Sequence, residues 1–164
     1  MMANESERDM AMLQTVDHTK RVAALLADVM HNIAIRAAQH DRSKFTPEEW
    51  PLFVDATAKL KGLTYGSDEY RQALAELKPS LDHHYANNSH HPEHYAQGVE
   101  GMDLIDLIEM LADWKAATER HANGSLSKSL EINRSRFHIG PQLEVVLRNT
   151  AQRFGWLESE ADHE

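Results

Sequence analysis

The sequence predicts an all-α protein, a single-domain helical bundle, and three observations support this. The chain has 164 residues, of which 41% are hydrophobic and 26% charged, as in an ordinary globular domain. Apolar residues recur at helical spacing, and no useful length of sequence alternates with period two. Capping residues, prolines and glycines stand where helices would start and end. We expect a helical domain over residues 15–156, a polar segment at 1–14 and an acidic tail at 157–164.

The first expected helix is marked by an apolar stripe with the spacing i, i+3, i+4, i+7 and i+11. The stripe comprises Val22, Leu25, Leu26, Val29 and Ile33. A second helix start is marked by Thr46, which would cap the helix, and by Pro47 at the first helical position. Glu49 follows the cap by three residues and would complete a capping box, although Pro51 could delay the helix by a turn.

Four further helices are expected toward the C-terminus. Ser67 opens the first of them and Pro79 closes it, Gly124 lies just beyond the second, and Pro141 begins the last. The expected ranges are 67–79, 102–122, 126–137 and 141–154.

Composition restricts the chemistry that this chain can support. Cysteine is absent, so histidine and carboxylate are the metal ligands available. The net charge of −9 argues against general nucleic-acid binding, but residues 115–138 carry +3, which suits a small anionic ligand better than a long polyanion. The polar N-terminus lacks the apolar core of a signal peptide, and the apolar runs are too short to span a membrane. We therefore expect a cytoplasmic protein.

One segment concentrates imidazole groups. Residues 83–95, HHYANNSHHPEHY, contain five of the eleven histidines of the chain. The asparagines, serine and proline within this segment favour a turn that would gather the rings. A solvated polar loop is one interpretation, and a metal site is the other, which requires ligands elsewhere in the chain.

Candidate ligands occur on both sides of that segment. His40 and Asp41 are adjacent in AAQHDRSKF, and His18 continues the apolar stripe toward the N-terminus. In MDLIDLIEMLADWKAA the carboxylates of Asp106, Glu109 and Asp113 share one face of an otherwise apolar helix. Buried carboxylates are costly unless they are paired, hydrogen-bonded or bound to metal, so ion pairs are the competing explanation for Asp113. Likewise, His18 could be a hydrogen-bonded core residue.

A geometric condition applies to His18. In one straight helix, the 22 steps from His18 to His40 at 1.5 Å per residue would place the two about 33 Å apart. Both can bind one metal only if the chain turns between them, and we expect that turn near residues 30–32.

With these residues, the chain resembles the HD-domain metal-dependent phosphohydrolase superfamily. The motifs are HTKRVAALLA with His18, AAQHDRSK with His40, Asp41 and Lys44, and MLADWKAA with Asp113. The superfamily pattern is H…HD…D on a helical bundle. Over residues 15–155 the chain more closely resembles an uncharacterised family from phages and bacteria, known only as a domain of unknown function. The motifs that carry this second resemblance are HDRSK, LKGLTYGSDEY, HHYANNSHHPEHY, GMDLIDLIEMLADWKAATERH and SLEINRSRF.

The HD resemblance implies a metal centre. It implies one ion held by His18, His40, Asp41 and Asp113, and further histidines for a second ion or for the pocket. His84 and His91 are the preferred residues for this role. The alternatives are His83, His90 and His94, because the sequence does not show which rings point inward.

The activity that this resemblance implies is hydrolysis of a phosphate ester, and the expected substrate is a nucleotide or another small phosphorylated metabolite. One or two ions of Mn, Fe, Co, Ni or Zn would suit histidine and carboxylate ligands and would activate water. Lys44 could bind the substrate phosphate, and Glu109 could accept a proton or orient a ligating histidine. Arg134 and Arg136 could clamp the phosphate, or they could be ordinary surface residues.

Two other functions fit the same residues. Some HD-fold proteins hold two iron ions and oxidise their substrate with oxygen, which would suit the same set of ligands. A non-enzymatic phage or bacterial binding protein with a structural metal is the other alternative. Trp50, Phe53 and Trp156 leave room for a homodimer.

Overall fold

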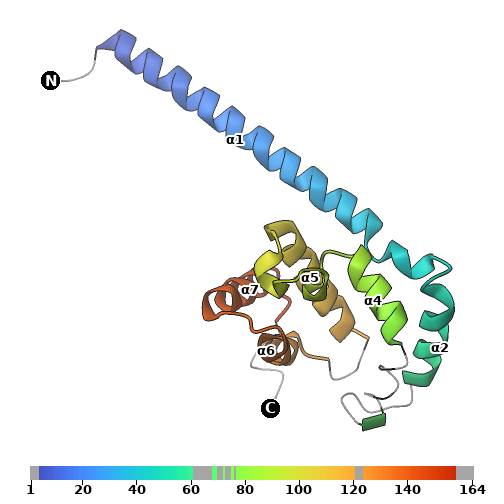
Figure 1. Ribbon diagram of the computed structural model, residues 1–164. Coiled ribbons are helices and arrows are strands. Elements are labelled where there is room, and N and C mark those ends of the chain that lie inside the picture. Colours follow the sequence, from blue (N-terminus) through green and yellow to red (C-terminus); the bar gives the residue numbers. More distant parts are fainter. Residues whose placement is uncertain are drawn as a thin grey trace. The chain divides into compact units, whose positions relative to one another are not determined.

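The computed structural model describes residues 4–60, 68, 69, 72, 75, 77–120 and 124–157 (Figure 1). Across these residues every regular element is a helix and there is no strand, so the all-α prediction is confirmed. In the same residues, no helix has both the length and the apolar character needed to cross a bilayer. The chain divides after Gln39 into two compact units, residues 1–39 and 40–164.

The first unit contains the long helix α1 (Glu5–Gln39). Its start is fixed by Asn4, whose side chain accepts a hydrogen bond from the Glu7 backbone N–H at 3.0 Å. The helix crosses the boundary that we placed between residues 14 and 15. It is also unbroken at residues 30–32, so the expected turn there is wrong: no glycine or proline interrupts the helical hydrogen bonds. None of its 35 residues is buried.

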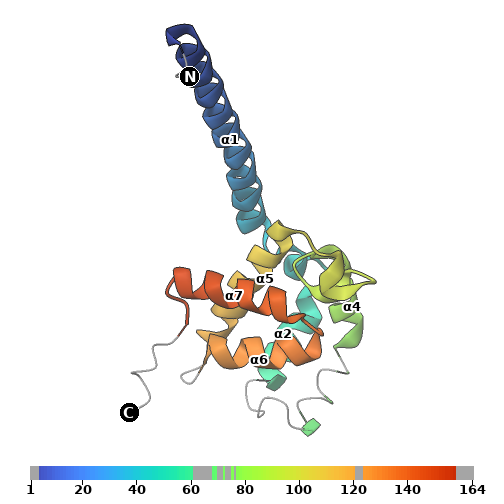
Figure 2. The same ribbon diagram turned by 90° about the vertical axis from the view of Figure 1, so that its left-hand side faces the viewer.

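The second unit contains shorter helices, and its apolar core lies between the last three (Figure 2). Met110, Leu126 and Leu147 come from three different helices and are almost fully buried in this core. The elements in chain order are η1 (Arg42–Phe45), α2 (Trp50–Leu60), α4 (Lys78–Asn87), η2 (Pro92–His94), η3 (Gly98–Gly101), α5 (Leu104–Thr118), α6 (Leu126–Arg136) and α7 (Pro141–Arg153).

The three core helices start where local chemistry dictates. Asp103 caps α5 in a reciprocal capping box with Asp106, and the Ser125 hydroxyl accepts the Lys128 backbone N–H at the start of α6. Pro141 occupies the first turn of α7. These helices confirm the predicted segments 102–122, 126–137 and 141–154 in type and order. Residues 121 and 122, which the first of these predictions includes, lie outside the described part of the chain.

One helix start follows the delay of a turn that Pro51 suggested, and one predicted boundary is wrong. Helix α2 begins at Trp50, after a turn in which the Thr46 carbonyl accepts the backbone N–H groups of Glu49 and Trp50. Glu49 does not close a capping box; its carboxylate is buried against histidines, as described below. Pro79 lies in the first turn of α4 instead of closing the preceding helix, since proline is well tolerated there. Residues 67, 70, 71, 73, 74 and 76 of the predicted segment 67–79 lie outside the described part of the chain, and residues 68, 69, 72 and 75 are helical.

Packing of α6 against its neighbours generates the first testable prediction. Leu130 is 1% exposed in the core of the second unit, so Leu130→Ala would leave a cavity and lower the free energy of unfolding by about 2–5 kcal/mol. Ile132 lies two residues further along α6 and is 50% exposed; Ile132→Ala should change it by less than about 0.5 kcal/mol. Urea denaturation monitored by circular dichroism measures both values, and equal losses would contradict the core assignment.

Candidate metal centre

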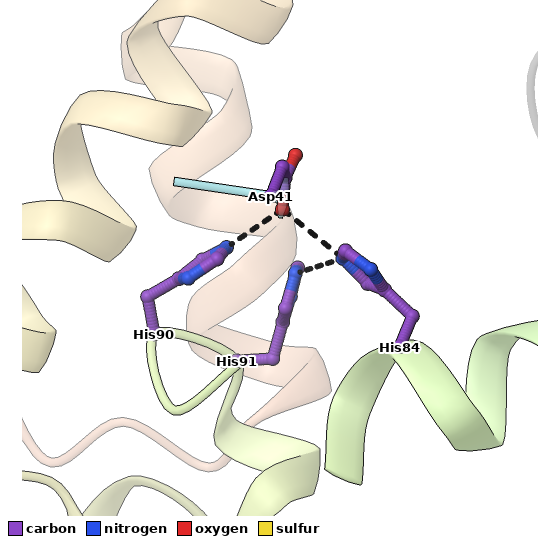
Figure 3. A group of neighbouring side chains, drawn as sticks. All are labelled: Asp41, His84, His90 and His91. Atoms are coloured by element: carbon purple, nitrogen blue, oxygen red, sulfur yellow. Dashed lines mark hydrogen bonds and ion pairs between the residues drawn. The ribbon is translucent and has the colours of Figure 1, made fainter. Parts of the chain in front are cut away.

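The centre is organised around Asp41, which follows the end of α1 and precedes η1. Its backbone adopts the left-handed conformation, with φ 56° and ψ 19°. Among non-glycine residues, aspartate and asparagine tolerate this conformation best, because their short polar side chains can bond locally. The turn directs the carboxylate toward the histidines of the following elements (Figure 3).

Three imidazole rings face Asp41 from the α4 side. His84 lies on α4, whereas His90 and His91 lie in the turn that follows this helix (Figure 3). The Nε2 atoms of His84 and His90 are 3.2 and 3.5 Å from Asp41 Oδ1, and the Nε2 atoms of His84 and His91 are 3.0 Å apart. Ligands held about 2.1 Å from a transition metal would lie roughly 3.0–3.4 Å from one another in octahedral or tetrahedral geometry. The observed separations fall close to this range.

His40 and α5 complete the cluster. His40 Nε2 lies 3.3 Å from Asp41 Oδ2 and 3.7 Å from Asp113 Oδ1. Glu109 and Asp113 are four residues apart on α5, so both carboxylates project from one face of this helix. Three overlapping groups have donor atoms within 4.8 Å of one another: Asp41 with His84, His90 and His91; His40 with Asp41 and Asp113; and His40 with His90 and Glu109.

A second layer of carboxylates fixes the ring orientations. Glu109 Oε1 lies 2.8 Å from Nδ1 of His40 and 3.1 Å from Nδ1 of His90. Glu49 Oε2 lies 2.9 Å from Nδ1 of His84. A carboxylate at Nδ1 favours the tautomer with a proton there, which leaves the Nε2 lone pair available for a metal. All three of these rings direct Nε2 toward Asp41.

The turn that carries His90 and His91 is anchored by Asp106 of α5. This buried carboxylate accepts hydrogen bonds from the Ser89 hydroxyl at 2.7 Å and from the Tyr95 hydroxyl at 2.6 Å. Asp106 therefore lies on the same face of α5 as Glu109 and Asp113, but its carboxylate accepts hydrogen bonds from the turn and from the Asp103 backbone N–H. These hydrogen bonds explain its burial without a metal.

Two polar atoms of the cluster lack a conventional partner. Within the described residues, Asp41 Oδ1 and His90 Nε2 are buried without a hydrogen bond, although they lie only 3.5 Å apart. An unpaired buried polar atom is costly, and a cation between the two would satisfy both.

The pKa values of the imidazole rings differ with their position in the cluster. The carboxylates of Asp113, Asp41 and Glu109 raise the pKa of His40 to about 11, and they outweigh its partial burial. Burial and the neighbouring rings of His90 and His84 lower the pKa of His91 to about 3. Burial alone would raise the pKa of the Asp41 carboxyl, but its contacts with His40, His84, His90 and Lys44 hold it well below its usual range. Negative charge is thus concentrated near His40, whereas His91 is neutral.

Most of the predicted site residues meet in this cluster. His40, Asp41, His84, His91, Glu109 and Asp113 all contribute donor atoms to the groups above. Lys44 forms an ion pair with Asp41 and lies 5.3 Å from the centre of the Phe53 ring.

The other predicted residues lie elsewhere. His18 is an exposed residue of α1, 21 residues before its end at Gln39, and it is in none of the groups; its role as a ligand needs a turn that α1 does not make. Arg134 pairs with Glu144 at 3.0 Å, and Arg136 pairs with Glu93 at 2.7 Å. Their role as phosphate ligands stays a prediction. Among the alternative histidines, His83 contacts Glu49, and His94 contacts the Tyr85 carbonyl.

Sequence reasoning undervalued His90 and missed Glu49. His90 is 2% exposed and belongs to two of the donor groups, yet it was only an alternative to His91. Glu49 is 1% exposed, and its position three residues after Thr46 was interpreted as a capping box. The sequence signal that could have identified it is Pro51: a proline in the first helical turn favours a helix start at Trp50, which leaves the Glu49 carboxylate outside the helix.

The chain belongs to DUF5662, a family of unknown function, whose sequence profile matches residues 8–153. No curated protein and no solved structure shows significant similarity to the chain.

The contact between Glu49 and His84 generates a second prediction. Glu49→Gln should lower the affinity for a divalent transition metal about 10–100-fold, because the amide cannot hold the rings of both His83 and His84 as the carboxylate does. The neighbouring Glu48 is exposed, and Glu48→Gln should leave the affinity unchanged. Competition against a fluorescent zinc chelator measures both variants. Equal affinities in two folded variants would show that Glu49 does not support the site.

Proposed function

We propose that this member of the DUF5662 family is a metal-dependent phosphohydrolase that acts on a nucleotide or another small phosphorylated metabolite. The observation that carries the proposal is the convergence on Asp41 of Nε2 atoms from His40, His84 and His90, each with its Nδ1 beside a carboxylate. Bound there, a divalent ion would polarise a phosphoryl oxygen and lower the pKa of a water ligand.

The donor set fits one or two ions of Mn, Fe, Co, Ni or Zn. Imidazole and carboxylate without thiolate suit these metals, and a carboxylate beside Nδ1 is a common support for a ligating histidine. Asp41 belongs to two of the three donor groups and presents a different oxygen to His84 and to His40, so it could serve one ion or bridge two.

The exposure of the cluster favours a catalytic over a structural ion. A structural site is closed by protein on every side. Here the side chains of His84 and His90 are 6% and 2% exposed, whereas those of His40 and Asp113 are 31% and 23% exposed. The centre is therefore sealed on the α4 side and accessible beside His40, where a substrate could reach it.

Three residues of the cluster, Lys44, Glu109 and Asp113, would act on the substrate, on a water molecule or on the ligating histidines. Lys44 lies at the rim of the cluster, and its ammonium group could leave Asp41 to contact a substrate phosphate when a metal takes its place. Glu109 contacts two imidazole rings, so these contacts favour its role as a positioning residue over that of a proton acceptor. Asp113, at 3.7 Å from His40, would serve as a ligand or as the group that receives a proton from water.

The resemblance to HD phosphohydrolases supports the same assignment. Its H…HD…D pattern is matched by His40, Asp41 and Asp113, which are drawn together from the end of α1 and from α5. The upstream histidine of the pattern falls on His18. The proposed site therefore relies on His84, His90 and His91 in its place.

Metal analysis gives the direct test. Protein purified without a histidine tag should contain one to two equivalents of transition metal, and Asp41→Asn should lose it. Asparagine tolerates the left-handed backbone at this position while it removes the charge. Asp55 is exposed on α2, so Asp55→Asn is the matched control and should keep its metal. Elemental analysis measures all three proteins.

The identity of the metal selects the next assay. Mn, Co, Ni or Zn, together with phosphate release from a nucleotide panel that stops on chelation, would support the hydrolase. Iron, together with substrate-dependent oxygen consumption and no phosphate release, would contradict the hydrolase and support an oxygenase. The absence of bound metal even after reconstitution would contradict both enzymatic functions.

Lys44 provides a prediction that separates substrate binding from metal binding. Lys44→Ala should retain the metal but lower kcat/KM for phosphate release by about 100-fold. The variant lacks the ammonium group that would stabilise the negative charge developing on the phosphate in the transition state. Lys128 is exposed on α6, and Lys128→Ala should have no effect. Steady-state assays with metal content measured in parallel test this, and unchanged kcat/KM would remove Lys44 from the site.

A further inference from the structure

One side of the Asp41 carboxylate belongs to a position with four donor atoms, which we call the three-histidine position. A carboxylate oxygen of Asp41 and one nitrogen each from His84, His90 and His91 lie within 4.8 Å of one another. His84 and His90 both approach the Oδ1 atom of this carboxylate, and all three rings point toward it from α4 and the turn that follows (Figure 3). Three imidazoles and one carboxylate are a ligand set that suits a divalent transition metal.

The other carboxylate oxygen of Asp41 belongs to a position with three donor residues, which we call the two-aspartate position. Asp41 Oδ2 lies 3.3 Å from His40 Nε2, and that nitrogen is 3.7 Å from Asp113 Oδ1. The ammonium group of Lys44 is ion-paired with the same Oδ2 atom. A cation of the protein itself therefore already contacts the two-aspartate position.

The remaining donor group, which contains Glu109, is not a third position. The Glu109 carboxylate contacts Nδ1 of His40 and Nδ1 of His90. Both rings still direct their Nε2 atoms toward Asp41. Glu109 therefore orients one histidine of each position instead of holding an ion of its own.

Unpaired polar atoms distinguish the two positions. Within the part of the chain that the structure describes, Asp41 Oδ1 and His90 Nε2 are buried without a hydrogen bond, and both face the three-histidine position. The Oδ2 atom, in contrast, has the ion pair with Lys44. A cation in the three-histidine position would satisfy two costly buried atoms, whereas a cation in the two-aspartate position would first have to break an ion pair.

Exposure differs between the positions in the same sense. The side chains of His84 and His90 are 6% and 2% exposed, whereas those of His40, Lys44 and Asp113 are 23–31% exposed. A buried position surrounds its ion with protein donors, while an exposed one leaves coordination places for water. The three-histidine position therefore suits a tightly held ion, and the two-aspartate position suits an exchangeable one.

We propose that the three-histidine position is the primary metal site of this protein and that the two-aspartate position takes a second ion only by displacing Lys44. The HD resemblance implies the opposite order, because it assigns its first ion to His40, Asp41 and Asp113 together with His18. His18 belongs to none of the donor groups, which leaves the two-aspartate position one ligand short. This inference rests on the metal centre of the proposed function but not on its reaction.

Stepwise metal binding tests the order of the two positions. Metal-free full chain without a tag is titrated with Zn²⁺ in competition with a chelator, and the first equivalent should bind about 100-fold or more tightly than the second. His91→Ala removes a ligand of the three-histidine position alone and should weaken the first step about 100-fold. Asp113→Asn alters the two-aspartate position alone and should abolish the second step while it leaves the first unchanged.

Lys44 gives an independent test of the displacement. Lys44→Ala should tighten the second step about tenfold or more, because no ammonium group competes for Asp41 Oδ2, and should leave the first step unchanged. A wild type that binds one ion and a Lys44→Ala variant that binds two would give the same support. Lys128 is exposed on α6, so Lys128→Ala is the matched control and should change neither step.

A crystal structure with one equivalent of Zn²⁺ locates the first ion without any substitution. Anomalous difference density at the zinc edge should lie among His84, His90 and His91 and leave Lys44 on Asp41. Density between His40 and Asp113 would overturn the proposal whatever the variants do.

The binding data distinguish failure of this inference from failure of the proposed function. A first step that is lost in Asp113→Asn and kept in His91→Ala would reverse the order of the positions, and a second step unchanged in Lys44→Ala would remove the displacement. Either result contradicts the inference even if the protein releases phosphate. Binding in the expected order without phosphate release from any substrate would contradict the hydrolase alone, and a protein that binds no Zn²⁺ would contradict both.

Discussion

The structure of the second unit depends on how the negative charge around Asp41 is balanced. Four carboxylates, those of Asp41, Glu49, Glu109 and Asp113, lie in or beside one cluster, and Glu49 is almost fully buried. Such a concentration of like charge is unfavourable unless cations or protonated rings compensate it. Histidine is well suited to this task, because each ring can face a carboxylate with one nitrogen and another group with the second.

Helix α5 links this cluster to the apolar core. Met110 and Leu111 pack against α6 and α7, while Glu109 and Asp113 project toward the histidines and Asp106 anchors the turn that carries His90. One helix therefore has two functions on different faces, and rigid packing on one of them limits the movement of the carboxylates on the other. This explains why a helix that is apolar around most of its circumference also carries three acids.

The sequence predicted those parts of the site that follow from residue type and spacing. It did not predict those that depend on the direction in which a side chain points. The His40-Asp41 pair, Asp113 and the histidine-rich segment could be recognised from residue types and spacing alone. The turn after α4 directs His90 as well as His91 toward Asp41, and no periodicity predicts the direction of a ring in a turn. Glu49 satisfied the pattern of a helix cap equally well, because a carboxylate three residues after a threonine serves either purpose. The continuity of α1 was misjudged for a related reason: the turn at residues 30–32 was required by an assumed ligand, His18, and not by any helix-breaking residue.

The same elements suggest how metal binding and folding would be coupled. The apolar core lies among α5, α6 and α7, whereas η1, α4 and the turn that contains Glu49 contribute mainly polar groups to the cluster. Within the described residues, these segments supply no fully buried hydrophobic side chain, and His84 contacts both Asp41 and Glu49. An ion bound by Asp41, His84 and His90 would join the segment before η1, α4 and the following turn at one point, and its binding free energy would add to the stability of this part of the fold. A bound ion would therefore stabilise the polar part of the unit, whereas the apolar core among α5, α6 and α7 contains none of the candidate ligands.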